Sequence, residues 1–226
     1  MPNITLYHGS DRIIQKPLFG YGRPYNDFGS GFYCTQAPEL AKEWACADNH
    51  DGYANRYSID ISKMKVLNLN GSEYNILNWL AVLTKHRTYW QNSSVSEDSK
   101  NYLQDNFYVD IEPYDIVIGY RADDSYFTFA QDFVANVISL RQLSEAMRLG
   151  KLGEQIVLKS PEAFDAVIFE GYEIADAKEY YEKKTSRDRK ARMQYRTSKA
   201  VDTNINDIYM LDVMREGMKN GDPRLR

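Results

Sequence analysis

Apolar and polar residues recur along the chain with two periods, which predict a mixture of strands and helices. Strands are expected where apolar residues occupy every second position or form a short run, over residues 3–7, 28–35, 53–61, 65–69, 114–119, 153–160 and 164–169. Helices are expected where apolar residues recur every three or four positions, over residues 38–48, 73–86, 125–136, 140–149, 172–199 and 205–218. This mixture predicts the α+β fold class.

Two stretches follow neither period and are predicted to be loops. Residues 17–26 are rich in glycine, proline and tyrosine, and a loop there could cover a ligand. Residues 91–100 are polar and contain four serines, a composition typical of a surface loop.

Length and charge limit what the chain can be. With 226 residues, of which 43% are hydrophobic, it is long enough for one sizeable core plus an extension, and two full-size domains are not expected. Its 28 Lys and Arg residues against 32 Asp and Glu residues give a net charge of -4, which excludes a general affinity for polyanions. Binding to nucleic acid would require a local basic patch.

Cysteine usage and the N-terminus bear on compartment. Cys34 and Cys46 are the only cysteines and form no Cys-x-x-Cys pair, so neither a zinc site nor a disulfide framework is indicated, and no metal is expected. A reducing cytoplasm is the default location. The N-terminus lacks a basic segment followed by an apolar run, and no stretch approaches the length of a membrane span, so no export or insertion is expected.

The sequences His-Gly-Ser at residues 8–10 and Gly-Ser-Gly-Phe-Tyr at residues 29–33 are the candidate chemical motifs. Gly9 and Gly31 lack side chains, so a ligand can approach the backbone closely there. His8 offers a hydrogen-bonding ring and Tyr33 a stacking face. Taken singly, each motif also fits an ordinary strand end or hairpin. In combination they favour a site for a flat, amide-bearing ring.

Trp44 lies on the helix expected after the second motif. Its neighbours Leu40, Ala41 and Ala45 form an apolar face, so packing against a sheet is one interpretation of Trp44. The preceding motifs favour a second interpretation, in which Trp44 contributes an aromatic face to a nucleotide site.

These three elements, in this order, resemble the ADP-ribosyltransferase superfamily, in particular the His-Tyr-Glu branch that includes diphtheria toxin and the poly(ADP-ribose) polymerases. The resemblance implies that His8 contacts the adenosine ribose of NAD and that the Gly9 backbone pairs with the nicotinamide carboxamide. It implies that Tyr33 and Trp44 cover the faces of nicotinamide. Ser10, Gly31 and Phe32 are carried over with their motifs as cofactor-binding positions.

The third motif of the family corresponds to the strand that begins near Gln155. The family normally has a glutamate there that bonds the nicotinamide-ribose 2′-hydroxyl, and this chain has Gln155 preceded by Glu154. Side chains alternate across a strand, so both cannot enter one cleft in regular geometry. The family register favours Gln155, in a His8-Tyr33-Gln155 triad, and Glu154 is the alternative if a bulge redirects it.

The identity of this residue matters for catalysis. Cleavage of the nicotinamide glycosidic bond develops positive charge on the ribose, which a nearby carboxylate stabilises. Glutamine cannot supply that charge, although it can bond the 2′-hydroxyl and position the ribose. A slower or acceptor-restricted enzyme is therefore expected.

Charged residues suggest two further contacts. Arg121 follows a buried-type strand and could bind a phosphate, or it could be neutralised by the aspartates after it. The expected helix over residues 172–199 is strongly basic and also contains tyrosines. This helix suits binding to a phosphate backbone or to an acidic partner. The alternative interpretation is that its charged residues form an ordinary solvent-exposed helix face.

The combined expectation is an ADP-ribosyltransferase-like domain over residues 1–170 and a helical C-terminal extension over residues 171–226. The domain would be a split sandwich of two facing antiparallel sheets with NAD in the cleft between them. The implied activity is transfer of one ADP-ribose from NAD to a protein, DNA or RNA, as in toxin-type enzymes that are paired with an antitoxin. The alternative is an inert NAD cleft in a binding module that acts through the basic helix.

Overall fold

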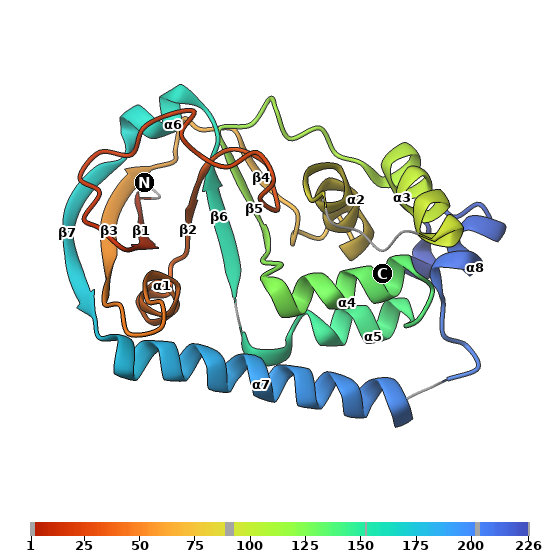
Figure 1. The fold of residues 1–226 in the computed structure, drawn as a ribbon. Helices are drawn as coiled ribbons and strands as arrows, with labels where there is room; N and C mark the ends of the chain where they lie inside the picture. Colours follow the sequence, from red (N-terminus) through yellow and green to blue (C-terminus); the bar gives the residue numbers. More distant parts are fainter. Residues whose placement is uncertain (1–2, 89–92, 152, 202–203, 226) are drawn as a thin grey trace.

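The computed structural model of the protein describes residues 3–88, 93–151, 153–201 and 204–225. Two β-sheets stand side by side, helices pack on the outer side of one of them, and the long helix α7 runs beneath both halves (Figure 1). The fold is mixed, with separate sheets and helices, as the α+β expectation requires.

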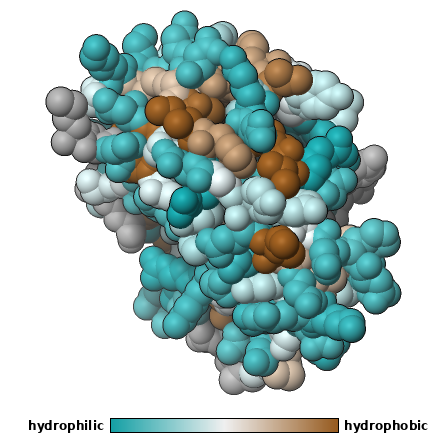
Figure 2. Space-filling model, turned by 90° about the vertical axis from the view of Figure 1, so that its left-hand side faces the viewer, coloured by the Kyte–Doolittle hydropathy of each residue, from teal (hydrophilic) through white to brown (hydrophobic). Residues whose placement is uncertain are grey.

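The first sheet contains three antiparallel strands in the order β1-β3-β7. These strands are β1 (Asn3–Ser10), β3 (Gly52–Asp60) and β7 (Ile168–Ala175). Edge strand β7 leaves Ile168 and Ile174 exposed. Figure 2 shows this side of the molecule, where hydrophilic surface predominates and hydrophobic patches lie apart from one another.

The second sheet contains four strands in the order β2-β6-β5-β4. They are β2 (Phe32–Cys34), β6 (Glu154–Leu158), β5 (Ile116–Tyr120) and β4 (Val66–Asn68). Strands β4 and β5 are parallel, so the expectation of two purely antiparallel sheets is wrong for this pair. Helices α2 and α3 lie between them in the chain and belong to the crossover connection that a parallel pair needs.

Helices fill the rest of the fold. Their bounds are α1 (Pro38–Ala45), α2 (Ile76–His86), α3 (Ser94–Phe107), α4 (Asp124–Val134), α5 (Leu140–Ala146), η1 (Leu149–Lys151), α6 (Pro161–Ala166), α7 (Ala177–Val201), α8 (Met210–Arg215) and η2 (Pro223–Leu225). None of the helices that the structure describes combines the length and the apolar content that a bilayer crossing requires.

Strand alternation divides the second sheet between two hydrophobic clusters. Phe32, Ile156 and Leu158 face the first sheet, where they pack in a cluster with Leu6 and Tyr57. The intervening residues, such as Val157, face a larger cluster formed with α2, α3 and α4. Each residue of β6 therefore belongs to one of two different environments, and a change of register by one residue would exchange them.

Helix α3 contradicts the surface loop predicted over residues 91–100. Within the described part of that stretch, the Ser93 hydroxyl accepts a hydrogen bond from the Ser96 amide and caps the helix. Ser96 and Ser99 are buried, together with Leu103 and Phe107 further along. The serines act as a cap and as small packing residues, roles that composition alone does not distinguish from a loop.

The strand predicted over residues 164–169 is also wrong in its first part. Ser160 caps α6 by accepting a hydrogen bond from the Ala163 amide, and Pro161 opens the helix. Strand β7 then runs to Ala175, so the sheet includes the first residues of the region expected to be a helical extension.

The C-terminal helices pack into the main body. Tyr195 of α7 and Met210 and Val213 of α8 are buried in the larger cluster, as is Leu225 of η2. The second C-terminal helix docks on the body as expected, although it is shorter than the predicted residues 205–218.

Candidate functional site

His8 stands near the end of β1 and is fixed by two neighbours. Its ring stacks on the Phe32 ring at 4.3 Å between centroids, and its Nδ1 lies 2.7 Å from the Tyr33 carbonyl oxygen. Burial lowers the pKa of His8, and the Tyr33 carbonyl only partly opposes this effect. A neutral ring that donates from Nδ1 leaves Nε2 as a hydrogen-bond acceptor. Phe32 itself is a core residue that supports His8.

Gly9 and Ser10 have structural roles in this arrangement. A Cβ at Gly9 would lie 2.0 Å from the Ala41 carbonyl oxygen, so only glycine lets α1 pack this closely on β1. The Ser10 hydroxyl accepts a hydrogen bond from the Asn55 amide at 3.1 Å and contacts the Arg12 backbone. The Gly9 backbone therefore lies directly beside the helix that carries Trp44.

Tyr33 is anchored by its hydroxyl to the turn that precedes it. The hydroxyl donates to the Gly29 carbonyl at 2.6 Å and accepts from the Phe28 amide at 3.0 Å. Burial raises the pKa of Tyr33. Because side chains alternate along β2, the Tyr33 ring faces the larger cluster, whereas Phe32 and the stacked His8 lie on the opposite face. The His8 ring therefore contacts the main-chain carbonyl of Tyr33 and lies on the other face of β2 from the Tyr33 ring.

The predicted covering loop contacts the glycine motif directly. A Cβ at Gly22 would lie 2.6 Å from the Gly31 nitrogen, and a Cβ at Gly31 would lie 2.5 Å from the Val157 side chain. Two glycines thus let the loop, β2 and β6 stack without intervening side chains. Gly31 is required for this packing whether or not a ligand approaches it.

Gln155 and Glu154 are separated by the regular alternation of β6. The strand pairs Gly119 with Gln155 and Tyr120 with Glu154, with no bulge at this point. Gln155 is buried, while Glu154 is exposed and accepts a hydrogen bond from the Asn70 amide at 3.0 Å. Of the two candidates, the structure brings Gln155 to the face that also carries Tyr33.

Asp27 lies behind Gln155 and was not predicted from the sequence. It is buried, forms an ion pair with Arg87 at 2.8 Å and accepts from the Ala122 amide at 2.8 Å. The Gln155 amide nitrogen lies 3.5 Å from the Asp27 carboxylate. Burial raises the pKa of Asp27, and Arg87 and the Ala122 amide oppose that effect. Asp27 thereby orients the Gln155 amide, so that Oε1 of Gln155 points away from Asp27 and can accept a hydrogen bond.

Trp44 and Arg121 form a second part of the site. The Arg121 guanidinium stacks on the Trp44 ring at 3.8 Å, and its Nε lies 3.9 Å from the Asp123 carboxylate. Burial lowers the pKa of Arg121, and Asp123 opposes this effect. Both interpretations of Arg121 thus remain open. Asp123 is near enough to neutralise its charge, and the guanidinium stacked on Trp44 is still placed to bind a phosphate.

Arg187 of α7 reaches the same region, and its role was also missed. It donates to the Glu43 carboxylate from Nε at 2.9 Å and from a terminal nitrogen at 2.6 Å. Glu43 precedes Trp44 on α1, and Arg187 lowers the pKa of Arg121, so the two guanidinium groups are electrostatic neighbours. Sequence periodicity gives no signal for this contact, because it joins residues 144 apart.

Four buried polar atoms in this region have no hydrogen-bond partner within the described residues. They are Trp44 Nε1, Arg121 Nη1, Gln155 Oε1 and Arg187 Nη1, and we call them the open polar set. Buried polar groups are nearly always paired in folded proteins, so such a set is expected where a ligand supplies the partners. Three donors, two of them on cations, and one acceptor suit an anion that carries hydroxyl groups.

A separate cavity of about 310 Å³ lies behind the glycine turn. His86, Glu112 and Lys159 line it, together with Gly29 and Gly31. Lys159 donates to the carbonyls of Phe28 and Ser30, at 3.0 and 3.1 Å, and so holds the turn in place. In the described ranges, no three His, Cys, Asp or Glu side chains gather as a metal-binding group.

Comparison with known proteins gives one match. Residues 4–169 match the family described as "Protein of unknown function (DUF3990)". No curated protein and no solved structure matched the chain. The matched segment contains the residues of the open polar set except Arg187, which α7 supplies from outside it. Because this match covers well over half of the sequence, the chain is a member of the DUF3990 family.

Proposed function

We propose that the protein is a mono-ADP-ribosyltransferase, which transfers ADP-ribose from NAD to a macromolecular acceptor and releases nicotinamide. The observation that carries the proposal is the open polar set beside the His-Gly-Ser and Gly-Ser-Gly-Phe-Tyr motifs. The proposed fold is the ADP-ribosyltransferase-like split sandwich, and the two sheets, joined by a backbone bridge between Tyr7 and Thr35, support it.

NAD would use both parts of the site. His8 Nε2 would accept from an adenosine-ribose hydroxyl, which fits its neutral ring. The Gly9 backbone would pair with the carboxamide beside Trp44, and Tyr33 would line the nicotinamide pocket. Arg121 and Arg187 would donate to the pyrophosphate, the kind of group that guanidinium binds best.

Gln155 would hold the reacting ribose. In the reaction, the bond between nicotinamide nitrogen and ribose C1′ breaks and its electron pair leaves with nicotinamide. The acceptor nucleophile then bonds to C1′ and loses a proton to a base. Oε1 of Gln155 would accept from the ribose 2′-hydroxyl, which positions the sugar without supplying a full negative charge. Positioning is therefore expected to contribute more than electrostatic stabilisation.

The test measures nicotinamide release and transfer of label from radiolabelled NAD to separate pools of protein, DNA and RNA. Gln155→Ala is expected to lower release about 10- to 100-fold, the loss expected for one hydrogen bond used in the transition state. His8→Ala and Tyr33→Ala are expected to abolish transfer.

Glu154→Ala is the matched control, because Glu154 is the exposed neighbour on the same strand and its variant should stay within twofold of the unmodified protein. Thermal unfolding of each variant separates lost activity from lost structure. Release no faster than in a reaction without protein would contradict the proposal, as would a larger loss for Glu154→Ala than for Gln155→Ala.

A further inference from the structure

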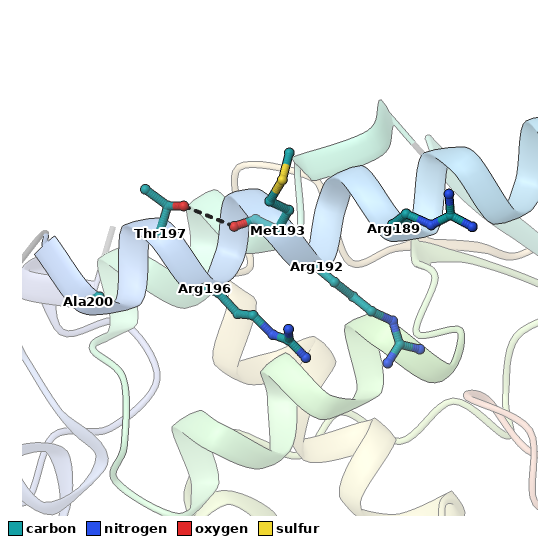
Figure 3. A pocket seen from close by; sticks show the side chains of 6 residues that line it. All are labelled: Arg189, Arg192, Met193, Arg196, Thr197 and Ala200. Carbon is teal, nitrogen blue, oxygen red and sulfur yellow. Dashed lines mark hydrogen bonds between the residues drawn. The ribbon is translucent and has the colours of Figure 1, made fainter.

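The C-terminal half of α7 carries an unusual concentration of positive charge. Residues 189–199 contain five Lys and Arg residues and no Asp or Glu, within a chain whose net charge is -4. Its exposed surface is an open hollow that we call the arginine face, lined by Arg189, Arg192, Met193, Arg196, Thr197 and Ala200. Figure 3 shows the side chains of Arg192 and Arg196 extending from the same side of the helix.

Only part of this charge is neutralised. Arg192 pairs with Asp188 at 2.8 Å, and Lys199 pairs with Asp132 at 2.8 Å. Arg189 and Arg196 have no ion-pair or hydrogen-bond partner within the described parts of the chain. The face therefore keeps a local positive field on an acidic protein, which attracts a polyanion.

The groove beside the face fits the same ligand. A groove of about 200 Å³ between α4 and α7 is lined by Arg192 and Arg196 and also by Asp132, whose carboxylate is paired with Lys199. Guanidinium groups are typical donors to phosphate oxygens.

The apolar content of the face favours nucleic acid over an acidic protein. Met193 is its one large exposed apolar side chain, at 64% exposure. A stable protein interface needs an apolar centre, whereas the phosphate backbone needs mainly cations. Tyr180 and Tyr195 are buried, so they cannot stack on the bases of a single strand. These features favour the backbone of a duplex, without sequence preference.

We propose that the arginine face of α7 binds duplex nucleic acid through its phosphate backbone, and that duplex nucleic acid is the acceptor class. The second statement rests on the proposed transferase function. The face begins two residues after Arg187, which contacts Glu43 next to Trp44, so a duplex bound there lies on the helix that also reaches the candidate site.

The experiment measures binding of the full chain to fluorescent duplexes of two unrelated sequences, without NAD, over a range of salt. Equal affinity for both sequences is expected, with a slope of log affinity against log salt of about -2.7 to -4.5, as three to five phosphate contacts give. Arg189→Ala with Arg196→Ala should weaken binding at low salt at least tenfold and reduce the slope by about 2. Alanine preserves the helix, so this variant should fold.

Arg23→Ala with Arg215→Ala is the control, because it removes the same charge from exposed arginines on other elements. Equal weakening by both double variants would overturn the proposed surface, and so would equally tight binding of poly-glutamate or of single strands. This measurement needs no NAD. Duplex binding without nicotinamide release would therefore contradict the proposed transferase activity and support the proposed binding surface. Transfer of label to protein and not to the duplex would overturn the assignment of the acceptor.

Discussion

At the scale of single residues, the Asp27 carboxylate accounts for the amide at position 155. Asp27 already takes part in an ion pair with Arg87 and lies 3.5 Å from the Gln155 side chain. A glutamate at 155 would place two carboxylates side by side in a buried environment, which disfavours ionisation of both. An amide instead donates a hydrogen bond to Asp27. If the proposed resemblance to the ADP-ribosyltransferases holds, the glutamine in place of their glutamate thus has a local physical reason.

A double-mutant cycle tests this coupling. Asp27→Asn should lower the free energy of unfolding by about 3 kcal/mol, because it breaks the ion pair between Arg87 and the buried Asp27. Gln155→Glu should also destabilise the protein, and the double variant should be more stable than the sum of the two losses predicts by about 1 kcal/mol or more. Urea denaturation measures all three.

The control is Asp11→Asn, which breaks an ion pair with both side chains 73% exposed and should cost less than about 1 kcal/mol. Strict additivity within the cycle would show that Asp27 and Gln155 do not interact.

His8 gives a prediction for acid pH. Burial holds its pKa below the ordinary 6.5, so the folded state binds its proton less readily than the unfolded state. Its contribution to stability is therefore complete above about pH 6.5 and is lost as the pH falls through the folded-state pKa. The stability advantage of the unmodified protein over His8→Asn should shrink between pH 7.5 and 5.5. Denaturation at both pH values measures it, and a constant difference would exclude titration of His8.

At the scale of elements, the sequence predicted a strand or helix correctly where its apolar pattern matches the side of the element that is buried. The strand near residues 53–61 and the helix near 38–48 were predicted, because one face of each is buried and the period is visible. Strand β7 was misplaced because most of its residues are exposed and no alternation marks it. The motifs singled out His8, Tyr33 and Gln155 as site residues, and that assignment stays a prediction.

Partners such as Asp27 could not be predicted, because their contacts join residues far apart in the sequence. The Asp27 contacts with Arg87 and Gln155 span 60 and 128 residues. Neither local period nor composition records such a pairing, and only the assembled fold brings these side chains together.

The Ser93 cap of helix α3, which the polar composition of this stretch did not predict, can be tested by substitution. Ser93→Ala removes the acceptor for the Ser96 amide and should lower the free energy of unfolding by about 1 kcal/mol. Ser94→Ala changes the next residue and should have an effect below about 0.5 kcal/mol. Thermal or urea unfolding distinguishes the two, and equal effects would argue against the cap.

At the scale of the whole molecule, the family-matched segment depends on residues outside it. Tyr195, Met210 and Val213 are buried in the larger cluster, and the Ala177 amide donates to Asp51 at 2.8 Å. The C-terminal helices are thus part of the hydrophobic core rather than an appendage.

Removal of residues 177–226 should therefore prevent cooperative folding, because it uncovers apolar side chains across the larger cluster. Circular dichroism during heating tests this expectation against the full chain. The Arg189→Ala and Arg196→Ala double variant is the control, since it changes only exposed residues of the same helix and should keep its melting temperature within a few degrees, about the effect of surface substitutions. A truncated chain that melts at the same temperature would show that the extension is dispensable.

The bridge between Tyr7 and Thr35 joins the edges of the two sheets beside His8. Its two backbone hydrogen bonds, at 2.7 and 2.9 Å, connect β1 of the first sheet to the residue that follows β2 of the second. Helix α7 crosses beneath both halves and is fastened to α1 through Glu43 and to α4 through Asp132 (Figure 1). Because α1 packs on β1 next to His8, helix α7 connects the surroundings of His8 to the helices of the other half of the molecule.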